Sequence, residues 1–144
     1  MENITKLAKA ADSLHRDLVF FCSERLAEMG LTTGLMYFVL DAAKYPGCTQ
    51  KELGDALGLD KAYVTRCLRK LTEDGFLMRR PHPTDGRASL LYVTPKGKEV
   101  FESCGAMLDE WDRSRLSALD EDERGELFTL LSKIQTETKG RKTV

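Results

Sequence analysis

The stretch that decides the fold is "TQKELGDALGLDKAYVTRCLRKLTEDG", residues 49–75. Thr49 is followed three residues later by Glu52, a capping-box pattern that marks the start of a helix. Gly58 predicts the end of that helix, and Asp60 predicts the N-cap of a second one. We expect Gly75 to end the second helix. Two short helices joined by a tight glycine turn indicate a helix-turn-helix.

The second helix has an apolar seam and an opposite face of different chemistry. Val64, Leu68 and Leu71 recur at intervals of four and three residues, so they share one side of the helix. The outward face is small, hydroxylic and basic. Opposite the seam lie Ala62, Arg66, Arg69 and Glu73, with Thr65 on one flank and Tyr63 and Lys70 on the other. Such groups suit a helix that lies in the major groove of DNA. A solvated helix face with salt bridges is the alternative.

The segment "RRPHPTDGRASLLYVTPKG", residues 79–97, follows directly and predicts a hairpin. We expect strands at residues 76–80 and 88–93, joined by a turn rich in proline, aspartate and glycine. Beside the helix-turn-helix, this hairpin would be a wing with Arg87 near its tip, able to enter a minor groove. Asp85 is expected to brace the loop by pairing with Arg79 or Arg80. An ordinary surface hairpin is the alternative interpretation.

Helices flank this region on both sides. Apolar spacing predicts a long helix over residues 4–29 and another that starts near Thr32. After the hairpin, Thr94 with Pro95 predicts the start of a long helix, and Asp120 predicts the start of a last one. These end helices have more apolar surface than one wing domain can cover, which favours a two-fold dimer.

The predicted fold is mainly α with a small β-hairpin wing. The chain of 144 residues is long enough for one core, so we expect a single domain over residues 1–144. Residues 32–97 would form a winged helix-turn-helix lobe. Residues 1–30 and 98–144 would supply dimerisation helices.

Charge is distributed unevenly along the chain. Residues 60–96 hold eight Lys or Arg residues against four Asp or Glu residues, a balance of +4 in a chain whose net charge is −1. A local basic segment in a nearly neutral chain favours a polyanionic partner. A solvated charged surface is the alternative.

Several classes of protein do not fit the sequence. No apolar run is long enough to cross a membrane, and the first residues lack the pattern of a secretory signal, so a cytoplasmic protein is expected. The four cysteines, at 22, 48, 67 and 104, lack the spacing of a zinc site and are interpreted as free thiols. With two histidines and no phosphate-cradling glycine loop, no enzyme, cofactor or metal site is predicted.

The order of helices, helix-turn-helix, wing and two further helices, together with "DGRASLLYVTPKG", resembles the MarR family of bacterial transcriptional regulators. The resemblance implies a homodimer that binds double-stranded DNA sequence-specifically at a pseudo-palindromic operator. The sequence departs from the family pattern at Tyr63, where the family usually has a small hydroxylic residue. The predicted DNA-binding residues are Thr49, Gln50, Lys51, Lys61, Ala62, Tyr63, Thr65, Arg66, Arg69, Arg80 and Arg87.

The same resemblance implies two ways of sensing a signal. In the first, the protein is a repressor released by a small aromatic or apolar ligand, bound in a cleft lined by His15, Arg16, Phe20, Met36 and Tyr37. In the second, Cys22 is oxidised, although its phenylalanine neighbours favour a buried structural thiol. A winged-helix module that binds a protein partner and no DNA is the competing class.

Overall fold

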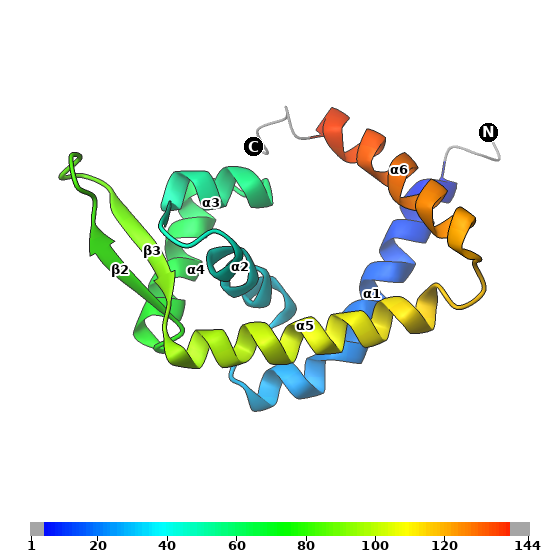
Figure 1. The fold of residues 1–144 in the computed structure, drawn as a ribbon, viewed down its shortest axis with the longest axis horizontal. Coiled ribbons are helices and arrows are strands. Elements are labelled where there is room, and N and C mark those ends of the chain that lie inside the picture. Colours follow the sequence, from blue (N-terminus) through cyan, green and yellow to red (C-terminus); the bar gives the residue numbers. More distant parts are fainter. Residues whose placement is uncertain (1–4, 139–144) are drawn as a thin grey trace.

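The computed structural model describes residues 5–138, and the outermost parts of the predicted end helices, residues 1–4 and 139–144, lie outside it. Six helices and a small antiparallel sheet are described, which confirms the predicted fold class (Figure 1). The elements are α1 (Lys6–Glu28), α2 (Thr33–Lys44), β1 (Cys48–Thr49), α3 (Gln50–Leu57), α4 (Lys61–Glu73), β2 (Leu77–Pro81), β3 (Ser89–Val93), α5 (Pro95–Arg115) and α6 (Glu121–Thr138).

The helix-turn-helix forms where its capping residues predict it. The Thr49 hydroxyl accepts the backbone N–H of Glu52, and the Asp60 carboxylate accepts that of Tyr63, both at 3.1 Å. Gly58 takes the left-handed conformation, with φ of 68°, that ends α3. The caps predicted for the later helices also form, at Thr94 before α5 and at Asp120 before α6.

The sheet has the strand order β1-β3-β2. Strands β2 and β3 are the two arms of the predicted hairpin, which projects at one end of the molecule (Figure 1). Strand β1 was not predicted, because two residues are too few to show the alternation of apolar and polar side chains that marks a strand. Its pairing of Thr49 with Leu90 holds the start of α3 beside the wing.

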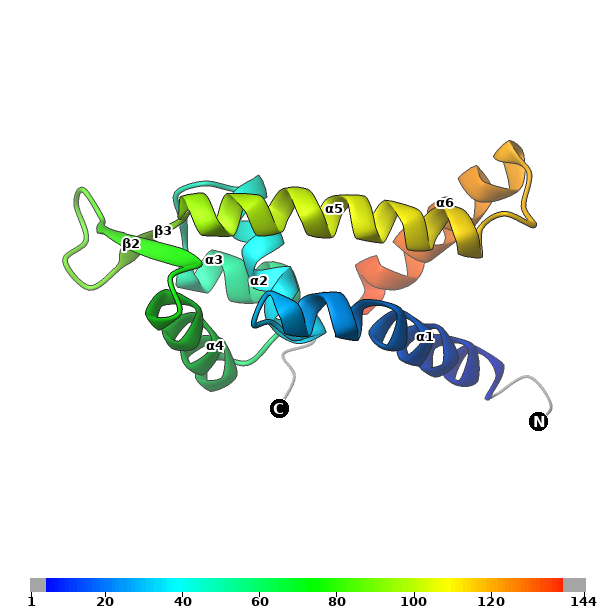
Figure 2. The same ribbon diagram turned by 90° about the horizontal axis from the view of Figure 1, so that it is seen from below.

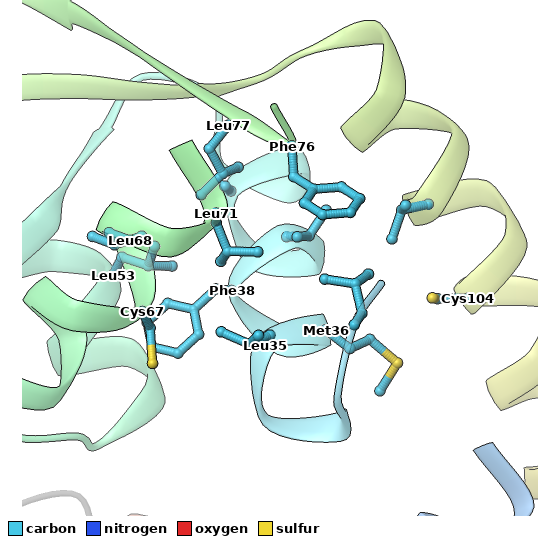
Figure 3. Close-up of a cluster of buried hydrophobic side chains, with 14 of the residues drawn as sticks. Leu35, Met36, Phe38, Leu53, Cys67, Leu68, Leu71, Phe76, Leu77 and Cys104 are labelled. Atoms are coloured by element: carbon cyan, nitrogen blue, oxygen red, sulfur yellow. The ribbon is translucent and has the colours of Figure 1, made fainter. Parts of the chain in front are cut away.

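The core lies between α2, α4, α5 and the base of the wing (Figure 3). Phe38, Leu68, Leu71 and Phe76 are among its largest fully buried side chains. Gly97 lets α5 approach this core, because a Cβ there would lie 2.2 Å from the carbonyl oxygen of Phe76. The winged part of the chain is thus closely packed within one copy.

Helix α5 spans the distance between the wing and the opposite end, where α1 and α6 lie (Figure 2). Asp17 of α1 forms an ion pair with Arg115 of α5 and accepts the indole N–H of Trp111 at 2.9 Å. The hydrogen bond from Arg115 lowers the pKa of Asp17, although burial opposes it. None of the helices in residues 5–138 is long and apolar enough to cross a membrane.

Candidate nucleic-acid interface

Helix α4 presents a basic face to solvent. Val64, Leu68 and Leu71 are buried, as the seam predicts. Ala62, Arg66 and Arg69 are exposed on the other side. The small residue and the two guanidinium groups therefore form an accessible ridge of the kind that reads DNA base edges and phosphates.

Tyr63 does not belong to this ridge. Its ring packs against Phe38 of α2, with ring centroids 6.4 Å apart, and a hydrogen bond with Cys67 raises the pKa of Tyr63. Its hydroxyl lies so close to Gly34 of α2 that a Cβ added to this glycine would be 3.3 Å away. The predicted role of Tyr63 as a hydrogen-bonding group toward DNA is therefore not supported, because the side chain fills space between α4 and α2.

An open groove runs between the start of α3, the start of α4 and the wing. Its lining includes Thr49, Gln50, Lys51, Lys61, Arg79 and Arg87. All of these except Arg79 are predicted DNA-binding residues. The groove therefore brings together cationic and hydroxyl groups that are up to 38 positions apart in the sequence.

A hydrogen-bonded network crosses this groove. The Gln50 amide donates from Nε2 to the Thr65 hydroxyl at 2.7 Å, and that hydroxyl donates to the Lys61 carbonyl at 2.8 Å. The Arg79 guanidinium donates to Gln50 Oε1 at 3.3 Å and to the Ser89 hydroxyl at 3.0 Å. One side chain of α3 thus bridges α4 and the wing.

The two arginines of strand β2 lie on opposite faces of the sheet. Arg79 shares the face of buried Leu77 and reaches the groove, whereas Arg80 lies over the ring of Tyr92 at 5.3 Å. The DNA contact of Arg80 therefore stays a prediction, and Arg79, which was not among the predicted DNA-binding residues, is the arginine of this strand that lines the groove. The two-residue alternation starting from the apolar Leu77 is the signal that could have found it.

The wing turn is braced differently from the prediction. Asp85 accepts the backbone N–H of Arg87 at 2.9 Å, and the ion pairs of residues 5–138 do not include a pair with Arg79 or Arg80. His82 Nδ1 also accepts the backbone N–H of Asp85, at 3.0 Å. The Asp85 carboxylate therefore shapes the turn by accepting a backbone N–H, and the Arg87 guanidinium stays exposed at the wing tip.

The predicted ligand-binding residues differ in burial within one copy of the chain. Phe20 is 84% exposed on α1, whereas Met36 is fully buried in the core. His15 and Arg16 are exposed, and Arg16 pairs with a carboxylate on its own helix. Tyr37 is half-buried, and burial raises its pKa. The cleft between the dimer helices and the DNA-binding lobe stays a prediction.

Cys22 is a core thiol. It is fully buried, and burial raises its pKa more than the nearby Arg25 lowers it. Cys104 is also fully buried, and burial raises its pKa to about 11. A sensor cysteine needs exposure and a lowered pKa, so this environment favours the structural interpretation of Cys22.

These elements define the class: a winged helix-turn-helix protein of the kind that binds DNA. The model of the MarR family matches residues 39–89. The chain is 43% identical over 118 residues to the HTH-type transcriptional regulator BilQ of Clostridium symbiosum, covering 82% of each protein. The chain belongs to the MarR family, and it is a DNA-binding transcriptional regulator rather than an enzyme.

Solved structures share the whole fold. The transcriptional regulator SlyA superposes with a TM-score of 0.89 at 21% identity, over 94% of this chain and 96% of that one. A mutant MarR from Escherichia coli complexed with operator DNA gives a TM-score of 0.79 at 24% identity, over 91% and 94% of the two chains. At 21% and 24% identity, these similarities show a shared fold.

Proposed function

We propose that this protein is a homodimeric repressor that binds a pseudo-palindromic operator in double-stranded DNA. Each copy would place α4 in a major groove and its wing in the adjacent minor groove. The observation that carries this proposal is the exposed ridge of Ala62, Arg66 and Arg69 beside a groove that ends at Arg87. The operator complex of the related E. coli fold is consistent with it.

The apolar surface of the outer helices supports the dimer. On α6, Phe128 is 51% exposed and Ile134 is 42% exposed, and on α1 Leu14 is 51% exposed. A second copy would bury these side chains by a two-fold contact. In this proposal residues 32–97 are the DNA-binding lobe, residues 1–30 and 98–144 form the dimer, and half-sites lie about one helical turn apart.

The groups of the interface have different proposed roles. Arg66 and Arg69 would contact base edges or phosphates, because guanidinium groups suit both. Thr49, Gln50, Lys51 and Lys61 stand at the starts of α3 and α4, where backbone N–H groups also favour phosphate. Arg87 would enter the minor groove from the wing tip.

A small aromatic or apolar effector would release the operator. Because Phe20 is exposed while Met36 is buried, a binding cleft at α1 needs surface from the second copy. Oxidation of Cys22 is the weaker alternative, since the thiol is fully buried. Operator binding in the presence of phenolic compounds or of peroxide separates the two, because only the peroxide response should disappear in Cys22→Ser.

Selection of genomic fragments by the purified protein, followed by titration of a selected fragment, tests the proposal. Arg66→Ala and Arg69→Ala should each weaken binding by about 1 to 3 kcal/mol. Lys70→Ala is the matched control, because the Lys70 ammonium pairs at 3.1 Å with Asp74, the C-cap of α4. Affinity should also fall steeply with salt.

A module that binds a protein partner and no DNA predicts a different result. It would select no fragment, and titration with DNA would show little dependence on salt. Equal behaviour of the Arg66, Arg69 and Lys70 variants would show that the ridge of α4 is not the contact surface.

A further inference from the structure

Gln50 occupies the junction of three elements that would meet DNA. It is the first residue of α3, directly after the two-residue strand β1 that pairs with β3. Its half-buried side chain touches Thr65 of the recognition helix α4 and Arg79 of the wing strand β2. Within residues 5–138, Gln50 is the α3 residue whose side chain is hydrogen-bonded to both α4 and β2.

We propose that Gln50 is a positioning residue that fixes the wing relative to the recognition helix and thereby sets which operator sequences the two elements can read together. The inference deepens the proposed function and rests on it. It replaces the simpler idea that Gln50 contacts a base directly.

The chemistry of the two partners requires a group that both donates and accepts. The Thr65 hydroxyl gives its only proton to the Lys61 carbonyl, so toward Gln50 it can only accept. The Arg79 guanidinium can only donate. An amide meets both demands at once, whereas a carboxylate only accepts and a hydrocarbon does neither.

The wing is joined to this amide through a braced arginine. Arg79 also donates to Ser89 across the hairpin, so the guanidinium ties β2 to β3 as well as to α3. A shift of the Gln50 side chain would therefore move the hairpin as a unit. Since the pairing of β1 with β3 also holds the wing, loss of the amide should loosen the wing without unfolding the protein.

A double-mutant cycle on operator binding tests the inference. Gln50→Ala should weaken binding about threefold to tenfold, and Arg79→Ala should cost about threefold less in the Gln50→Ala background than in the wild type. Arg80→Ala is the matched control, because Arg80 has the same charge on the same strand but faces Tyr92. Its effect should be independent of residue 50.

Two further readouts separate positioning from direct base contact. In Gln50→Ala, selected operators should lose preference at the flanking positions next to the wing, and hydrogen exchange of the wing in the free protein should accelerate. Gln50→Glu should not restore the wild-type behaviour, because a carboxylate cannot donate to Thr65. The thermal midpoint should change little in both variants, since one partly exposed hydrogen bond contributes modestly to stability.

The inference is overturned if the Gln50 and Arg79 effects add and Gln50→Ala changes preference at a single base position, which is the result for a direct reader. Unchanged hydrogen exchange of the wing in Gln50→Ala would also overturn it. A wild-type protein that selects no DNA would instead refute the proposed function, and the exchange experiment on free protein would still report whether Gln50 holds the wing.

Discussion

The winged lobe, residues 32–97, buries its largest apolar side chains, whereas α6 and the first part of α1, up to Phe20, leave large apolar side chains exposed. In the lobe, Phe38 and Leu91 are fully buried and Phe76 is 1% exposed. On the outer helices, Phe20 is 84% exposed and Phe128 is 51% exposed. None of the described side chains of α6 is buried.

The difference shows which apolar side chains one copy of the chain can bury by itself. The lobe completes its core within one copy of the chain, with Leu26 of α1 and Val100 and Cys104 of α5 among the buried residues. The outer helices leave an apolar surface that water would not favour, so their sequence fits a contact with another copy. Substitutions in the two regions should therefore differ in their effects on folding, dimerisation and operator binding.

The largest effect is expected from truncation in the lobe core. Phe76→Ala should lower the free energy of unfolding by about 3 to 5 kcal/mol, because it leaves a cavity among buried side chains. Phe128→Ala removes the same atoms from α6 and should lower the free energy of unfolding less. Its effect should depend on protein concentration, because Phe128 would be buried only in the dimer. Urea unfolding followed by circular dichroism at several concentrations measures both. If both variants lost the same free energy of unfolding at every concentration, the two regions would not differ in how they bury apolar side chains.

A charged substitution should separate the two copies while leaving the lobe intact. Leu131→Arg combined with Ile134→Arg places two cations on the exposed apolar face of α6. Sedimentation should then show a monomer at micromolar concentration, and operator affinity should fall about 100-fold because two half-sites are no longer bound by one particle. A dimer of unchanged strength would mean that α6 is not part of the interface.

Removal of the wing-tip cation should affect the lobe alone. Arg87→Ala is expected to weaken operator binding by about 1 kcal/mol, mainly where the flanks are rich in A and T. Dimerisation should not change, in contrast to the α6 variant. Fluorescence titration against fragments that differ only in their flanks gives the answer, and an equal loss on all flanks would contradict a minor-groove role.

The smallest effect concerns the contact between α1 and α5. The pKa of Asp17 is lowered by its hydrogen bond from Arg115, so the stabilisation is present above the ordinary pKa of an aspartate and is lost as pH falls through the lowered value. Asp17→Asn should therefore lower the thermal midpoint near neutral pH and converge with the wild type in acid.

Asp12→Asn is the control for this experiment, because its ion pair with Arg16 lies within α1 and joins no second helix. It should change the midpoint less than Asp17→Asn does. A difference between Asp17→Asn and the wild type that persists or grows in acid would contradict the role assigned to the ion pair.

Local signals explain what could be predicted of the fold. The caps at Thr49, Asp60 and Thr94 and the turn at Gly58 involve residues within a few positions of each other, so their patterns can be read directly. The apolar seam of α4 follows from helical periodicity alone. The wing was also predicted, with each strand end within one residue of that observed.

The candidate site was predicted less completely, because orientation depends on partners far away in the chain. Gln50 is an example, because its amide contacts Thr65 of α4 and Arg79 of β2, which lie 15 and 29 positions away. Tyr63 sits beside the ridge of α4 on a helical wheel, yet Phe38 provides a surface that draws its ring inward.

The sequence by itself determined the helix-turn-helix, the wing and the basic character of the segment, because short-range hydrogen bonds and periodicity govern them. The tertiary structure decided that Gln50 bridges α4 and the wing. It also decided that Met36 lies in the core while Phe20 is exposed. These outcomes depend on which distant elements pack together, and no local pattern encodes that packing.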